Sequence, residues 1–265
     1  MHSGFSGSSR FEVIVLPMAG EGIRFRTAGY ATAKWNLPLA GRTLLEWSLL
    51  SFSNFFDKER FLLVHREGDV TTEFLKGVAK EFGIMNLDVV CLEETTRGQA
   101  ETVSKGLSQV EMTTDESLTI FNIDTLRPGY EPKERQAASD GWLECVHAVG
   151  DHWSFVVEDK YERGRVLKVA EKKRISKNCS TGLYYFAQRQ IFDEAYAKEC
   201  SGWSGGEIYV APLYNHTIKM GCRVSFDLIL PEDVFFSGTP ADYEQCLRQH
   251  TEITRRFGGN DLPPV

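Results

Sequence analysis

The sequence has few of the features that mark secreted or membrane-spanning proteins. Its six cysteines are scattered without a C-x-x-C pair, and no apolar run reaches the roughly 18 residues that a transmembrane helix needs. The first ten residues, MHSGFSGSSR, are small and polar and lack the apolar core of a secretory signal. We therefore expect reduced thiols in a cytoplasmic protein, no membrane partner, and a disordered lead over residues 1–10.

Several catalytic signatures are missing as well. No two histidines stand at H-x-x-x-H spacing and no G-x-S-x-G occurs, which excludes the common zinc and serine hydrolases. The dinucleotide fingerprint G-x-G-x-x-G is incomplete because Phe25 stands at its third glycine, and the Walker G-x-x-x-x-G-K-[ST] is absent. The net charge of -7 argues against nonspecific binding of nucleic acid. Any anionic ligand must therefore be met by local cations.

The first half of the chain alternates apolar runs of strand length with helical patterns. The runs are FEVIVLP, RFLLVH, LDVVCLE and LTIFNID, at residues 11–17, 60–65, 87–93 and 118–124. Between them, residues 71–82 and 99–110 repeat apolar side chains on one helical face. This order is typical of βαβ units in a parallel sheet with helices on both faces. We predict an α/β protein with a Rossmann-like sheet.

The second half predicts hairpins and therefore a mixed sheet. A connection rich in glycine, proline and charge, residues 126–141, precedes four strand-like runs at 142–149, 154–159, 165–172 and 180–187. Helices at 189–200 and 208–221, a strand at 223–230 and a last helix at 239–250 follow. We expect one domain over residues 11–258 and a short tail at 259–265.

The loop after the first strand, AGEGIRF, stands where open α/β sheets bind phosphate. Gly20 and Gly22 would let the backbone turn with positive φ and approach a ligand, and Arg24 would add a charged fork for phosphate oxygens. A G-x-G after a strand is equally often a plain tight turn. On this loop alone, both interpretations stay open.

The longer segment VIVLPMAGEGIRFRTAGYATAK, followed by LPLAGRTLLEW, resembles the nucleotide loop of the sugar-nucleotide nucleotidyltransferases, the nucleoside-diphosphate-sugar pyrophosphorylases. TRGQAETV, NID, EKKRISKNCSTGLYYF, GEIYVAPLYN and GTPADYE resemble later landmarks of that family, in the family's order. The resemblance spans about residues 12–245. It implies a Rossmann-like mixed sheet with helices on both faces, the GT-A-like nucleotidyltransferase fold.

The resemblance also implies roles for the matching residues of the nucleotide half. Arg24 would hold the leaving phosphates and Lys34 would contact the α-phosphate, as the catalytic cations. The nucleotide would be bound by Ala19, Gly20, Gly22, Gly98 and Gln99. Asp124, which ends a strongly apolar strand, would hold Mg²⁺ through its oxygens. Ala33 and Trp35 replace the prolines that commonly flank the lysine.

In the acceptor half, the resemblance implies that Glu171 accepts hydrogen bonds from hydroxyls and that Lys172 meets the acceptor phosphate. The remaining acceptor residues would be Thr181 and Gly182, through their backbone, and Glu207. One family position departs from the pattern, because Phe236 stands where many members carry a second metal aspartate. The possible replacements are Asp227, Asp233 and Asp242.

These roles predict transfer of a nucleotidyl group from an NTP to a phosphorylated small-molecule acceptor, a sugar 1-phosphate, by Mg-assisted in-line attack on the α-phosphorus. A cytidylyltransferase for a non-sugar phosphate such as phosphocholine stays open, because aromatic residues that could contact a cation are available: Trp35, Trp153, Trp203, Tyr184 and Tyr185. A glycosyltransferase that uses an NDP-sugar and a non-catalytic nucleotide sensor are further alternatives. The base, the acceptor and the oligomeric state are not indicated.

Overall fold

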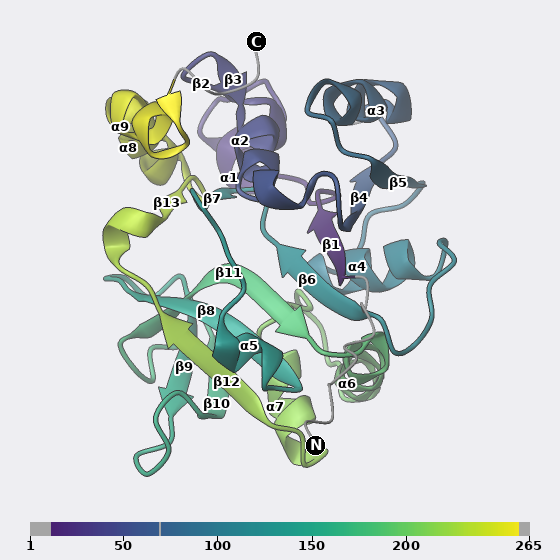
Figure 1. Ribbon diagram of the computed structural model, residues 1–265, viewed down its shortest axis with the longest axis vertical. Coiled ribbons are helices and arrows are strands. Elements are labelled where there is room, and N and C mark those ends of the chain that lie inside the picture. Colours follow the sequence, from purple (N-terminus) through teal and green to yellow (C-terminus); the bar gives the residue numbers. More distant parts are fainter. Residues whose placement is uncertain (1–11, 69, 260–265) are drawn as a thin grey trace, which may run out of the picture.

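The computed structural model describes residues 12–68 and 70–259, which are arranged around one long mixed sheet (Figure 1). The lead predicted for residues 1–10, and residues 260–265 of the predicted tail, lie outside the described residues. The sheet has the strand order β10-β9-β11-β6-β1-β4-β5, with β8 beside β11 and β12 beside β8. In the described part of the chain, no helix is both long and apolar enough to cross a lipid bilayer.

The first half of the chain supplies parallel strands, as predicted. They are β1 (Glu12–Pro17), β4 (Arg60–Arg66), β5 (Asn86–Leu92) and β6 (Ser117–Phe121). Each is a short apolar run, and β6 ends at Phe121 rather than at residue 124. Because successive side chains of a strand point to opposite faces, β1 contributes to two separate core layers.

Helices cover both faces of this part of the sheet. α4 (Gln99–Leu107) packs into the core layer that contains Val13 and Val15 of β1. α2 (Leu44–Leu50) and α3 (Thr72–Glu81) pack into the layer on the opposite face. The structure thus confirms the predicted α/β class with helices on both faces.

The second half of the chain makes the sheet mixed. Its strands are β8 (Gly141–His147), β9 (Ser154–Glu158), β10 (Val166–Glu171), β11 (Asn178–Phe186) and β12 (Val224–Leu228). β11 runs antiparallel to β6 and thereby joins the two halves, whereas β12 runs parallel to β8. α6 (Arg189–Ser201) and α7 (Leu213–Lys219) pack against each other over the core layer of α4.

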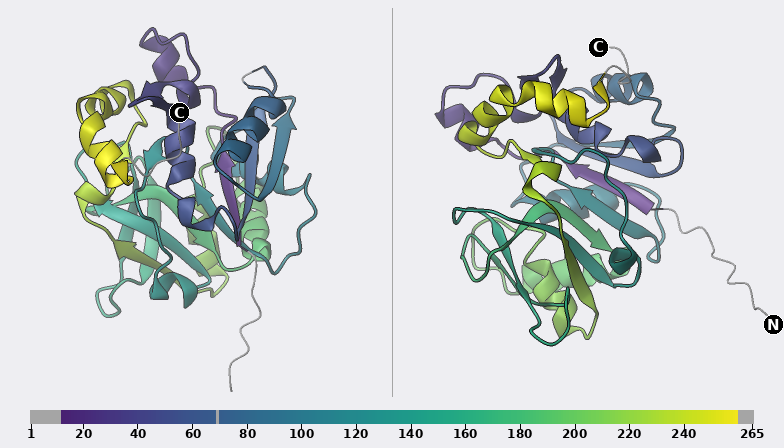
Figure 2. Two further views of the ribbon diagram at one scale, coloured as in Figure 1. Left: turned by 45° about the horizontal axis from the view of Figure 1, so that its top comes forward. Right: turned by 60° about the vertical axis from the view of Figure 1, so that its left-hand side comes forward.

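The connections between the longer elements contain short helices and strands. They are α1 (Ile23–Thr27), η1 (Lys34–Asn36), β2 (Pro38–Leu39), β3 (Arg42–Thr43), η2 (Ser53–Phe55), β7 (Thr125–Leu126), α5 (Glu134–Ala137), η3 (Pro231–Asp233) and β13 (Phe235–Phe236). The predicted last helix is two helices, α8 (Pro240–Arg248) and α9 (His250–Arg256). In both views of Figure 2 these helices (yellow) lie beside the early part of the chain (purple), and their buried side chains share the core layer of α2.

One predicted helix is much shorter than expected. The pattern of residues 208–221 indicated a continuous helix, but α7 begins only at Leu213. Ile208 instead donates its backbone N–H to the carbonyl of Arg97 at 2.8 Å, and its own carbonyl accepts from the N–H of Ala100 at 3.0 Å. These bonds to a distant segment replace the helical bonds, because a buried backbone group needs one partner and either kind satisfies it.

Candidate active site

An open cleft of about 980 Å³ is lined by the loops at the carboxyl ends of the central parallel strands. Every residue that the sequence predicted for the site lines this cleft: Ala19, Gly20, Gly22, Arg24, Lys34, Gly98, Gln99, Asp124, Glu171, Lys172, Thr181, Gly182 and Glu207. Segments that are far apart in the chain therefore meet where open α/β sheets usually bind ligands. Their individual roles stay predictions.

The loop between β1 and α1 is held in a fixed turn. Gly22 has φ 62°, a left-handed conformation that favours glycine, and its carbonyl accepts from the N–H of Phe25 at 3.0 Å. Phe25, at the position of the missing third glycine, is buried against the rings of Tyr30 and Tyr243. The aromatic side chain thus anchors α1 in the core. Arg24, on the same helix, stays exposed at the cleft.

Lys34 and Asp124 form an ion pair on the cleft surface, although they are 90 residues apart in the chain. Their side chains are 19% and 20% exposed, so solvent and ligand can still reach both groups. Trp35, the neighbour that replaces a proline, is buried, and its ring lies 6.1 Å from that of Phe74. Packing of Trp35 against α3 therefore holds η1, and Lys34 with it, in place.

The segment before α4 is shaped by close packing. Gly98 has φ 140°, and a Cβ there would lie 2.6 Å from Cγ of Glu207 and 2.7 Å from the carbonyl oxygen of Ile208. Only glycine fits where the backbone at position 98 comes this close to Glu207 and Ile208. Gly98 is therefore the point of contact between the predicted nucleotide segment and the predicted acceptor segment. The Gln99 side-chain amide donates to the side-chain oxygen of Asn122, a cleft residue that the sequence reasoning had not singled out within NID.

The acceptor residues form a connected polar cluster. Lys172, in a left-handed conformation with φ 50°, donates its ammonium to the hydroxyl of Tyr209, and that hydroxyl donates to Glu207. Ser154 donates to the carboxylate of Glu171. The sequence did not predict Tyr209 or Ser154; the nearest signal was the position of Tyr209 inside GEIYVAPLYN.

Burial and charge tune this cluster. Desolvation raises the pKa of Glu171, while the hydrogen bond from Ser154 and the charge of Lys172 oppose the shift. The positive charge of Arg24 also lowers the pKa of Glu171, so the phosphate loop and the acceptor cluster lie within electrostatic reach of each other. Burial likewise raises the pKa of the Tyr209 hydroxyl, with Glu207 adding to the rise. Tyr209 therefore stays protonated and can donate a hydrogen bond.

Solved structures with this architecture share one kind of activity in their names. A nucleoside-diphosphate-sugar pyrophosphorylase from Vibrio cholerae RC9 is 40% identical, over 89% of this chain and 100% of that chain, with a TM-score of 0.84. This chain belongs to that family. Members of the sugar-nucleotide nucleotidyltransferases are enzymes, so the chain is a nucleotidyltransferase rather than a glycosyltransferase.

Two more distant structures share the fold of the family. They are an inositol-1-phosphate CTP transferase from T. maritima, at 20% identity over 94% of this chain and 98% of that chain with a TM-score of 0.72, and an apo-UDP-glucose pyrophosphorylase, at 13% identity over 91% and 98% with a TM-score of 0.70. No protein-family model and no curated protein matches the chain. The fold is therefore that of the nucleotidyltransferases, as predicted.

Asp124 is the cleft residue that the sequence predicted for a metal, and a Cβ on Gly238 would lie 3.3 Å from its Oδ2 and 4.0 Å from Oδ2 of Asp242. Asp242 also lines the cleft, but its carboxylate accepts from the N–H of Thr239 at 3.0 Å in the capping box of α8, whose N-cap is Thr239. Within residues 12–68 and 70–259, no group of three or more His, Cys, Asp or Glu could hold a metal ion.

Two of the proposed replacements for a second metal carboxylate do not line the cleft. Asp227 accepts from the indole N–H of Trp142 at 2.9 Å and forms an ion pair with Arg135 at 3.4 Å. Asp233 forms an ion pair with Arg256. Of the three, only Asp242 is near Asp124, and Phe236 itself lines the cleft. A metal here would have to take its other ligands from the substrate, which is how Mg²⁺ is commonly bound at phosphate sites.

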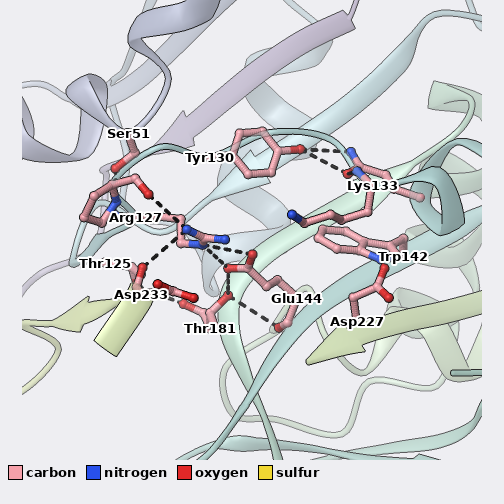
Figure 3. A network of polar contacts seen from close by, with 12 residues as sticks. Ser51, Thr125, Arg127, Tyr130, Lys133, Trp142, Glu144, Thr181, Asp227 and Asp233 are labelled. Atoms are coloured by element: carbon pink, nitrogen blue, oxygen red, sulfur yellow. Dashed lines mark hydrogen bonds and ion pairs between the residues drawn. The ribbon is translucent and has the colours of Figure 1, made fainter. Parts of the chain in front are cut away.

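Thr181, which lines the cleft, belongs to a buried polar network that Figure 3 shows from close by. Arg127 and Glu144 form an ion pair at 3.0 Å with side chains only 7% and 1% exposed. The Thr181 hydroxyl donates to Oε1 of Glu144 at 3.2 Å, and the Thr181 carbonyl accepts from the Thr125 hydroxyl at 2.9 Å. The side chain of Thr181 thus belongs to this network, and the role predicted for its backbone stays a prediction.

Gly182 is fixed by the neighbouring strand. A Cβ there would lie 2.6 Å from Cγ of Asn122, and the Gly182 carbonyl accepts from the N–H of Asn122 at 3.1 Å. Because Asn122 also receives the Gln99 amide, one side chain links the predicted base segment to the predicted acceptor segment. The contact explains the glycine at position 182 without any ligand.

Proposed function

We propose that the chain transfers a nucleotidyl group from a nucleoside triphosphate to a sugar 1-phosphate. An oxygen of the acceptor phosphate would attack the α-phosphorus in line, and the bond from the α-phosphorus to the oxygen bridging the β-phosphate would break. The products are an NDP-sugar and pyrophosphate, and no electrons are gained or lost. The observation that carries the proposal is a single cleft that contains the phosphate loop, the Lys34–Asp124 pair and the cluster around Lys172.

The phosphate loop and Lys34 would act on the triphosphate. The backbone between Ala19 and Gly22 and the exposed guanidinium of Arg24 would bind the β- and γ-phosphates, which leave as pyrophosphate. The ammonium of Lys34 would exchange its carboxylate partner for an oxygen of the α-phosphate. Positive charge placed where negative charge develops stabilises the transition state.

Asp124 would hold a divalent cation. The oxygen ligands that this cleft supplies fit such a cation only when phosphate oxygens complete its coordination. Mg²⁺ prefers oxygen ligands and is usually bound through one or two carboxylates together with substrate phosphates. When bound, it would supply charge that neutralises the phosphate oxygens. Asp124 would orient that charge, and Asp242, on the other side of Gly238, is the second carboxylate in reach.

The cluster on the other side of the cleft would bind the acceptor. Lys172 would pair with the acceptor phosphate, while Glu171 and Glu207 would accept hydrogen bonds from sugar hydroxyls. Phosphocholine is less well supported: of the five aromatic residues that the sequence offered for a cation pocket, Trp35, Trp153 and Tyr184 line the cleft, but Trp35 and Tyr184 are buried. The six free thiols support a place in the cytoplasm.

Pyrophosphate release with each nucleoside triphosphate and a panel of hexose 1-phosphates, in the presence of Mg²⁺, tests the proposal. We expect turnover with at least one pair and its loss in Lys34→Ala. Lys80→Ala, exposed on α3 outside the cleft, is the matched control and should turn over normally. Full turnover by Lys34→Ala would refute the mechanism, and tight nucleotide binding without turnover by the wild type would indicate a sensor.

A further inference from the structure

Two aromatic rings form one wall of the cleft. Trp153 and Phe236 lie with their ring centroids 4.7 Å apart at 68°, an edge-to-face contact, and both line the cleft. The indole N–H of Trp153 donates to the carbonyl of Val149 at 2.8 Å, which fixes the orientation of the ring. The ring of His152 lies 4.5 Å from that of Trp153 and extends the wall.

This wall connects the proposed metal carboxylate with the proposed acceptor clamp. Phe236 of β13 pairs with Thr125, the residue that follows Asp124. At the other end, the Trp153 carbonyl accepts from the N–H of Lys172 at 2.9 Å. An acceptor whose phosphate reaches both the α-phosphorus and Lys172 would therefore have its carbon skeleton beside the two rings.

We infer that Trp153 and Phe236 form an apolar platform for one face of the acceptor's sugar ring and thereby select ring-shaped acceptors. The inference rests on the proposed function. Specific pockets combine apolar and aromatic walls with a few placed polar groups, and here Glu171, which accepts from Ser154 next to Trp153, and Glu207 supply polar groups in the same cleft. Phe236 serves this platform at the position where other family members carry a carboxylate.

The charges around the platform favour a neutral ring over a cationic head group. Lys172 and Arg24 both bear positive charge at the acceptor cluster, and both act electrostatically on Glu171. The carboxylates nearby already accept hydrogen bonds, Glu171 from Ser154 and Glu207 from Tyr209. The two cations offset the two carboxylates, so the cluster offers a trimethylammonium group no net negative charge, whereas the C–H face of a sugar ring would bury apolar area on the rings.

The test is the Michaelis constant for each substrate in the full chain. We expect Trp153→Leu and Phe236→Leu to raise KM for the sugar 1-phosphate roughly three- to tenfold, because an aromatic contact is worth about 1 kcal/mol beyond its buried area. KM for the nucleotide should change less than about twofold, since a lost platform acts only on the acceptor. Trp153→Phe should keep most of the affinity for the sugar 1-phosphate. Tyr161 is 85% exposed and lies outside the cleft, so Tyr161→Leu is the control and should behave as wild type.

Calorimetric binding of the sugar 1-phosphate to the same variants separates this inference from the proposed function. If the wild type never turns over but binds the sugar 1-phosphate more tightly than Trp153→Leu does, the platform is supported and the proposed activity is refuted. Equal binding by wild type and Trp153→Leu would refute the platform even where turnover is normal. A parallel rise in KM for both substrates would also overturn it, and thermal unfolding of each variant identifies those that fail to fold.

Discussion

The ammonium of Lys34 forms an ion pair with the carboxylate of Asp124, and this contact joins η1 to the loop after β6. In the absence of ligand each group neutralises the other, so the cleft does not hold an unpaired charge at this point. Under the proposed mechanism, a triphosphate would offer the lysine a phosphate oxygen, and the carboxylate would then become available to a divalent cation. The pair would therefore open as the substrates bind.

Asp124→Asn should lower kcat about 100- to 1000-fold, the scale seen when one charge-stabilising group is removed from a preorganised site. Half-saturation by Mg²⁺ should shift to higher concentration, because an amide oxygen binds the cation more weakly than a carboxylate. The free energy of unfolding should change by less than about 1 kcal/mol, as for other solvent-accessible ion pairs. Urea unfolding measures the stability, and a magnesium titration of the rate measures kcat and the half-saturation by Mg²⁺. A normal rate of Asp124→Asn at low Mg²⁺ would contradict the role of Asp124 in holding the cation.

Gly98→Ala should destabilise the protein and raise KM for the nucleotide. The added Cβ would meet Glu207 and the backbone of Ile208, and alanine tolerates φ 140° poorly, so we expect a loss of about 1–3 kcal/mol. Gly77→Ala on α3 is the control, since its Cβ would meet nothing within 4 Å. There the change should add roughly 0.5–1 kcal/mol of helix stability. Equal stability of the two variants would show that the close approach is relaxed in solution.

Glu144→Gln should cost about 3–5 kcal/mol of stability, because it leaves the buried guanidinium of Arg127 without its countercharge. Acceptor binding should weaken in the same variant, since Thr181 loses its carboxylate partner behind the cleft. Glu252→Gln, which breaks the exposed pair with Arg255 on α9, should change the stability little, because solvent screens that pair. Chemical denaturation compares the free energies of unfolding of the two variants. A loss of similar size in both would refute the prediction that the buried pair contributes more to stability than the exposed one.

Stability should fall as the pH rises from about 4.5 to about 7. Desolvation raises the pKa of Glu12 from 4.5 to about 7, with Glu59 adding to the rise and the bond from Thr119 opposing it. The folded protein thus binds a proton that the unfolded chain has released over this range, so the contribution of Glu12 to stability is fully present below about pH 4.5 and is lost as the pH rises through about 7. The loss from this group is on the order of 3 kcal/mol.

Glu12→Gln should flatten that part of the stability profile, because glutamine keeps an oxygen for Thr119 and carries no charge. Urea unfolding of both proteins at pH 5 and pH 8 measures the difference. The variant should be the more stable one at pH 8 and close to wild type at pH 5. Parallel profiles for the two proteins would assign the pH dependence to other groups.

Local sequence patterns were enough to predict the parallel strands and the helices over them, whereas the residues of the nucleotide loop were expected from the family resemblance. Apolar periodicity reports burial along a single element, and buried strand ends place their following loops at one edge of the sheet. The same patterns failed at residues 208–221, where a backbone pairing of Ile208 with Arg97 replaces the first helical turns and the helix begins only at Leu213. A local pattern cannot register such a partner.

Local patterns alone established the α/β class, because it depends on short-range hydrophobic spacing, whereas the order of the site segments was implied by the family resemblance of their motifs. Tertiary packing decided which side chains face each other: Lys34 with Asp124, Lys172 with Tyr209, and Trp153 with Phe236. The position expected to carry a second carboxylate thus became part of an aromatic wall. These pairings depend on how the antiparallel half folds against β6, and contacts between distant residues follow from three-dimensional packing rather than from spacing along the chain.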